Sequence, residues 1–264
     1  MNSLLNLKIF FFHFWTVLCI CQFDTNIIFM TTISYETTYL YFFAGLFPII
    51  TSIICIMYFC FGGHYSNGWI NEKGIYRRFD DSLIGISEFM VPYPESKIFS
   101  VFIAFESVVI ACVFYVRQAI IEIYSKNPFR NRNGFLVLKV LLYVFNIMAP
   151  IGLFLFGSFT VDDNLVVHKI GKHLFILSTI LFSLVTDMTL KAMKLLKNMI
   201  YSIILFVLLI IYIVLMIVES QIEETGSLAQ NIIVAFDFII FFALFLKVLL
   251  FVKDVPKHNL TLTI

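Results

Sequence analysis

Residues 199–218 read MIYSIILFVLLIIYIVLMIV and contain no charged side chain. A helix that spans a membrane needs about 20 predominantly apolar residues, because the hydrocarbon core is roughly 30 Å thick and each helical residue adds about 1.5 Å. This stretch supplies that length without interruption. It therefore predicts a transmembrane helix.

The composition of the whole chain agrees with this stretch. Of its 264 residues, 61% are hydrophobic and 13% are charged, and the mean hydropathy is +0.96. Soluble domains are about half apolar and about a quarter charged. The formal net charge of +1 lacks the basic excess of nucleic-acid-binding proteins. The composition therefore excludes a soluble fold and predicts no nucleic-acid partner.

Six stretches share this length and low charge. They are residues 41–61, 98–116, 136–157, 173–190, 199–218 and 229–252. Each is about twice as long as a barrel strand and lacks period-two alternation, which favours helices over a β-barrel. We therefore predict an all-α, polytopic integral membrane protein with six transmembrane helices in one bundle.

The residues outside the spans flank or connect them. We take residues 41–257 as the six-span membrane domain, 258–264 as a cytosolic tail and 1–40 as a hydrophobic extension. Lys8 followed by apolar residues 9–21 is similar to a secretory signal, but no small-residue cleavage site follows it. The extension is retained at the membrane, forms an additional span or is a cleaved signal, and the sequence leaves these three alternatives open.

Lysine and arginine gather at one end of the predicted spans. They occupy the connections after spans two and four and the C-terminal tail: Arg117, Lys126, Arg130, Arg132, Lys191, Lys194, Lys197, Lys253 and Lys257. The opposite-side connection 219–228 contains three glutamates and no cation. Because cytosolic connections carry the excess of Lys and Arg, both termini are predicted to face the cytosol.

Two carboxyl groups lie inside predicted spans. Glu106 and Asp237 each lie eight residues beyond the lumenal start of their spans, about 12 Å deep. A charge at the bilayer centre costs on the order of 2.5–3.5 kcal/mol, so each group needs a partner or a role. The two carboxyls form one intramembrane polar site, or each is separately neutral or hydrogen-bonded. The sequence leaves both readings open.

The remaining intramembrane charges are predicted to be structural. Asp187 and Lys191 are spaced to pair across one helical turn. Lys139 and Lys247 lie near the ends of their spans, where a lysine stem can carry its charge to the interface.

The usual catalytic signatures do not occur in the chain. It contains no G-x-S-x-G, H-E-x-x-H, P-loop or dinucleotide fingerprint, so no catalytic residue, metal or cofactor is predicted. His168 and His173 are about 140° apart around a helix, which is poor geometry for two ligands of one metal. We interpret them as a loop histidine and an interfacial one.

Several short segments resemble one family. Residues 93–99, YPESKIF, open the second span, preceded by ISE at 86–88 and closed by YVR at 115–117. They resemble the I-S-D, P-P-E-S-x-I-F and Y-x-R-Y elements of the damage-regulated autophagy modulator (DRAM) family. Val167-His168 is similar to that family's V-H before span four. The resemblance covers roughly residues 42–256.

The resemblance implies a six-span protein with cytosolic termini. For the DRAM branch it also implies lysosomal or endosomal membranes and promotion of autophagy. The broader clan includes the Golgi factor for GPI-anchor lipid remodelling and the CWH-type N-terminal domain. On physical grounds Pro94, Glu95 and Ser96 form a helix cap. The motif residues Ser87 and Glu95, with His168, also form a candidate lumenal site for a headgroup or partner.

We therefore expect a non-enzymatic membrane protein that uses no cofactor and acts on membrane lipids or membrane-protein partners through its lumenal loop, Gly62 to Lys97, and its intramembrane polar site. GPI-anchor lipid remodelling or lipid transfer in the Golgi or ER is the alternative, with Glu106, Asp237 and His168 as acid and base candidates. A proton-coupled small-solute transporter is a further one. Composition carries no organelle address, so Golgi and plasma membrane remain alternatives to the lysosome.

Overall fold

A computed structural model of the chain describes residues 30–32, 36–62, 69–70, 76–77, 86, 91–92, 95–124, 133–196, 198–219, 228–254 and 261–263. The chain divides into two compact units. The smaller combines Met1–Glu36 with Pro256–Ile264, and within it β1 (Met30–Thr32) pairs antiparallel with β4 (Thr261–Thr263). Most of the N-terminal extension lies outside the described residues, so its three alternatives stay open.

The larger unit, Thr37–Val255, carries the predicted helices. Within the described residues these are α2 (Glu36–Phe61), α4 (Glu95–Tyr124), α5 (Asn133–Ser158), α6 (Val161–Ala192), α7 (Ile200–Glu219) and α8 (Leu228–Leu250), with a 3-10 turn η1 (Phe251–Asp254) after α8. All six helices are long and apolar enough to cross a membrane. The predicted six-helix fold is confirmed. A short hairpin of β2 (Trp69–Ile70) and β3 (Tyr76–Arg77) lies between α2 and α4.

Helix α6 begins at Val161 and not at residue 173 as predicted. A capping box starts it: the Thr160 hydroxyl accepts from the Asp163 backbone N–H, and the Asp163 carboxylate accepts from the Thr160 N–H at 3.0 Å. The helix bends at Asn164, whose backbone is not helical. Residues assigned to a loop, including His168 and Lys172, therefore lie on a helix.

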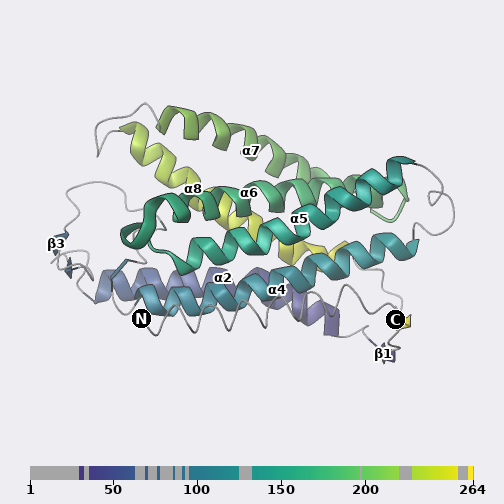
Figure 1. The fold of residues 1–264 in the computed structure, drawn as a ribbon, viewed down its shortest axis with the longest axis horizontal. Coiled ribbons are helices and arrows are strands. Elements are labelled where there is room, and N and C mark those ends of the chain that lie inside the picture. The colour runs from purple at the N-terminus through teal and green to yellow at the C-terminus, as the bar shows by residue number, and fades with distance from the viewer. Residues whose placement is uncertain are drawn as a thin grey trace. The chain divides into compact units, whose positions relative to one another are not determined.

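The helices form an antiparallel succession (Figure 1) in which α6 is central. It packs along α5 and also contacts α4, α7 and α8. Glycines let α5 and α6 approach closely, because a Cβ on Gly152 or Gly171 would collide with backbone atoms of the opposite helix. The outer faces are apolar and exposed, as on α7 at Val207, Ile210 and Val214. Such faces are suited to contact with lipid.

One face of α4 points into the bundle. Its buried residues recur every three or four positions: Phe99, Ile103, Glu106, Ile110, Phe114 and Arg117. Near the start of the helix, Phe99 packs on Phe156 of α5, with ring centroids 5.7 Å apart. Further along, Phe114 stacks on Phe182 of α6 at 4.0 Å. Glu106 therefore lies on the interior face of the helix, between these two contacts.

Candidate functional site

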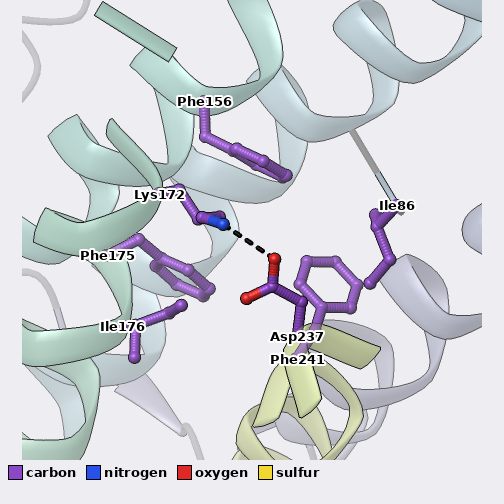
Figure 2. A pocket seen from close by; sticks show the side chains of 7 residues that line it. All are labelled: Ile86, Phe156, Lys172, Phe175, Ile176, Asp237 and Phe241. Carbon is purple, nitrogen blue, oxygen red and sulfur yellow. Dashed lines mark hydrogen bonds and ion pairs between the residues drawn. The ribbon is translucent and has the colours of Figure 1, made fainter. Parts of the chain in front are cut away.

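A pocket lies between α5, α6 and α8 (Figure 2). It is lined by Ile86, Phe156, Lys172, Phe175, Ile176, Asp237 and Phe241. Its cavity measures about 10 Å³, which is about the space that one water molecule needs. Five of the seven lining residues are apolar and the other two carry opposite charges. The pocket is therefore a small polar centre within an apolar wall.

The two charged residues form an ion pair. Lys172 Nζ on α6 donates to Asp237 Oδ2 on α8 at 2.8 Å, and the side chains are 16% and 19% exposed. Two charges that are mostly shielded from water attract each other more strongly than exposed ones, but each also loses hydration, so the pair is weak evidence for stability by itself. Asp237 thus has a cationic partner that the predicted loop assignment of Lys172 concealed.

Aromatic rings surround the pair. The Phe156 ring lies 6.3 Å from that of Phe241 and 4.7 Å from that of His168, and Phe175 packs 5.7 Å from Phe245. Phe156, Phe175 and Phe241 are all buried. The rings are therefore held by neighbours on three helices, and the wall of the pocket is preorganised.

The structure corrects the predicted environment of the histidines. His168 is buried on α6, with Nδ1 2.7 Å from the carbonyl oxygen of Phe159, so it is neither in a loop nor solvated. His173 Nδ1 lies 2.7 Å from the Tyr212 hydroxyl on α7. Each ring nitrogen thus joins two segments of the bundle.

The predicted cap and lumenal site are only partly visible. Helix α4 begins at Glu95, which is fully buried, and the Ser96 N–H donates to the Pro92 carbonyl at 2.8 Å. Ser87 and Pro94 lie outside the described residues. A site that joins Ser87, Glu95 and His168 stays a prediction.

Glu106 and Asp237 have different surroundings. Glu106 is fully buried, and among the described residues neither of its carboxylate oxygens has a hydrogen-bond partner. Asp237 is paired with Lys172, and Glu106 does not line their pocket. The two helices that carry them pack mainly on other helices, α4 on α5 and α8 on α7. A site shared by both carboxyls therefore stays a prediction without a contact to support it.

The sequence patterns did not point to a second polar cluster, centred on Asp187. The carboxylate pairs with Arg117 Nη2 through Oδ1, and its Oδ2 accepts from Lys247 Nζ and from the Ser202 hydroxyl, each at 2.6 Å. All four side chains are buried. Asp187 lies about 22 Å along α6 from Lys172. The cluster therefore joins α4, α6, α7 and α8 at a level distant from the pocket.

This cluster overturns three expectations. Asp187 pairs with Arg117 and Lys247, while Lys191 is exposed. Lys247 does not extend to the interface, since it is buried and lies 5.1 Å from the Phe251 ring centroid. Arg117 is not a loop cation, because α4 continues past it to Tyr124. In the sequence, the YVR segment at 115–117 singled out Arg117 but did not indicate its ion-pair partner.

Lys139 also has a partner. Its Nζ donates to Glu122 Oε2 at 3.3 Å, and the side chains are 38% and 32% exposed. The pair lies at a partly exposed contact between α4 and α5. It is the expected setting for an interfacial lysine, with an added ion pair.

Six helices that can each cross a membrane, three of which line a polar pocket, define a multi-pass membrane protein. The family model of the Frag1/DRAM/Sfk1/Cwh43P N-terminal domain matches residues 36–258. The chain therefore belongs to this family, and the resemblance noted in the sequence is confirmed at that level. No curated protein and no solved structure matches the chain significantly.

Proposed function

We propose that this protein binds membrane lipid through the Lys172–Asp237 pocket and, without enzymatic activity, promotes autophagy at lysosomal or endosomal membranes. The observation that carries the proposal is the ion pair itself. Charged residues within spanning helices are costly and commonly mark ligand or ion sites, and this pair lies in a pocket whose wall is aromatic. The YPESKIF segment supports the autophagy branch, which is one of the branches of the matched family.

The proposal includes cytosolic termini and membrane-protein partners. Its support is the charge distribution: Lys191, Lys194 and Lys253 are exposed near the ends of α6 and α8. Buried Arg117 no longer counts toward this excess. Tags at both termini, probed after selective permeabilisation of the plasma membrane, should be accessible from the cytosol. Accessibility only from the lumenal side would contradict this orientation.

The pocket can be tested in cells that lack the protein. The double variant Lys172→Met with Asp237→Asn removes both charges and leaves neither one buried without its counterpart. We expect wild-type protein to restore autophagic flux and the double variant to leave it at the level of the deletion, with equal abundance in lysosomal membranes. Lys169→Met is the matched control, because Lys169 lies on the same helix and does not line the pocket. Full flux with the double variant would exclude the proposal.

A second candidate function is GPI-anchor lipid remodelling or lipid transfer. The observation that favours it is Glu106, because a buried carboxyl without a hydrogen-bond partner among the described residues is available to exchange a proton. His168, by contrast, is engaged with the Phe159 carbonyl. Under this alternative, Glu106 is the acid or base.

Substitution of Glu106 separates the two functions. If the group has no catalytic role, Glu106→Met is expected to raise the melting temperature, because it removes a buried polar group whose burial costs about 1–3 kcal/mol when unsatisfied, and function is retained. Thermal melting of the detergent-solubilised chain measures the change in stability, and autophagic flux measures whether function is retained. Glu122→Met is the control and should give no gain, because Glu122 is already paired. Loss of anchor remodelling at unchanged abundance in Glu106→Gln would support the enzyme instead.

A further inference from the structure

We infer that the Lys172–Asp237 pocket recognises a zwitterionic phospholipid headgroup that ends in a primary ammonium, with Lys172 binding the phosphate and Asp237 the ammonium. The inference rests on the proposed function, in which this pocket binds lipid, and it names the chemical class of the ligand. Three features carry it: the balance of charge, the aromatic wall and the size of the cavity.

The balance of charge selects a zwitterion. The pocket holds one cation and one anion, joined at 2.8 Å and mostly shielded from water. An anionic lipid that engaged Lys172 would leave the Asp237 carboxylate without its counter-charge, which is unfavourable in an apolar setting. A headgroup that carries both charges replaces the Lys172–Asp237 ion pair with two others, one between Lys172 and the phosphate and one between Asp237 and the ammonium. Lysine binds phosphate as a point charge, and its flexible stem lets Nζ turn from Asp237 toward the ligand.

The aromatic wall favours an ammonium beside Asp237. Figure 2 shows one carboxylate oxygen directed at Lys172 and the other pointing away from it. Phe156, Phe175 and Phe241 lie around this carboxylate. Aromatic rings are polarisable and can approach an ammonium group closely. The second oxygen offers an ammonium a hydrogen-bond acceptor, and the rings beside it offer an aromatic wall in place of water.

The cavity limits the size of that ammonium. About 10 Å³ accommodates about one water molecule, and a primary ammonium is similar in size to a water. A trimethylammonium is larger and has no N–H to donate to Asp237. Only the ammonium group fits this space, so ethanolamine-type headgroups fit better than choline-type ones, while the larger phosphate and the acyl chains remain outside it.

The test compares lipids on the purified full-length chain in detergent. Melting temperature is measured against rising concentrations of short-chain phosphatidylethanolamine, phosphatidylcholine or phosphatidylglycerol, with free glycerophosphoethanolamine, a zwitterion, as a further arm. Wild-type protein should bind the ethanolamine lipid roughly tenfold more tightly than the other two, the equivalent of about one charge-assisted hydrogen bond. A response to free glycerophosphoethanolamine identifies the headgroup as the recognised part. Equal binding of ethanolamine and choline lipids would overturn the inference.

A charge exchange separates recognition from structural pairing. Lys172→Asp with Asp237→Lys retains an ion pair between α6 and α8 but reverses its polarity. A pair with only a structural role predicts that this variant keeps the wild-type lipid response. We expect the ethanolamine preference to be lost while the basal melting temperature is retained. If the exchanged variant does not fold, Lys172→Met with Asp237→Asn serves in its place, and a preference that persists there would equally overturn the inference.

The two proposals fail separately. If autophagic flux depends on the pocket but the purified protein shows no preference for the ethanolamine lipid, the proposed function stands and the ligand class is rejected. An ethanolamine preference that depends on the pocket, with flux unchanged in the charge-removing double variant, retains the ligand class and rejects the role in autophagy.

Discussion

Replacing Asp187 with asparagine is expected to leave little folded protein in the membrane. The Asp187 carboxylate pairs with Arg117 and Lys247 and accepts a hydrogen bond from the Ser202 hydroxyl. The side chains of all four residues are buried. Removing one member of a buried ion pair costs about 3–5 kcal/mol, because the remaining charge is left without its counter-charge in an apolar setting. Size-exclusion chromatography of a fluorescent fusion in detergent measures the folded fraction, and its loss on heating gives the melting temperature.

The matched control is Glu122→Gln. Glu122 also pairs with a lysine, but both side chains are about a third exposed, and exposed pairs contribute about 0–1 kcal/mol. The control should therefore fold almost as well as the wild-type protein. Similar melting temperatures for Asp187→Asn and Glu122→Gln would show that the buried cluster does not hold the four helices together.

Gly152→Ala is expected to separate α5 from α6. A Cβ at this position would collide with the backbone nitrogen of Phe175 and would lie 2.9 Å from the carbonyl oxygen of Gly171. Neither atom can turn away as a side chain can, so the helices themselves must move. We expect a loss of about 3 kcal/mol, the upper end of typical overpacking costs, measured by thermal melting in detergent.

Gly157→Ala is the control for this substitution. The three atoms nearest to its Cβ all belong to the side chain of Ile103, Cβ included, so Ile103→Gly removes them. The loss of melting temperature caused by Gly157→Ala should therefore be smaller in an Ile103→Gly background than in the wild-type background. No shortening of a side chain should rescue Gly152→Ala. A wild-type melting temperature for Gly152→Ala would contradict the close approach of the two helices.

The number and type of the helices could be predicted because length and lack of charge are strong signals in a lipid environment. The ends of the helices could not be predicted, because polar residues that continue a helix inside the bundle have the same hydropathy as the residues of a loop. Val161–Lys172 contains two aspartates, an asparagine, a histidine and two lysines, and only the capping box at Thr160 indicates a helix start. Taken as a helix start, the capping box at Thr160 places Lys172 on a helix.

The candidate site was predictable in part for the same reason. Asp237 stood out as a carboxyl within an apolar stretch, but its partner depends on which helices are neighbours and how each is rotated. The sequence of a single span reveals neither which helices are its neighbours nor how it is rotated against them. Asp187 shows the limit: sequence spacing suggested Lys191, four residues away, whereas the structure supplies Arg117 from 70 residues earlier and Lys247 from 60 residues later.

These separations bear on how the protein is made. Translation delivers Arg117 first, Asp187 next and Lys247 last, since they belong to α4, α6 and α8. The arginine therefore lacks this acidic partner until α6 is synthesised, and the last lysine arrives only with the final helix. Ionic closure of the bundle is thus a late step in biogenesis, and a nascent chain that stalls before α8 presents an incomplete polar seam to membrane quality control.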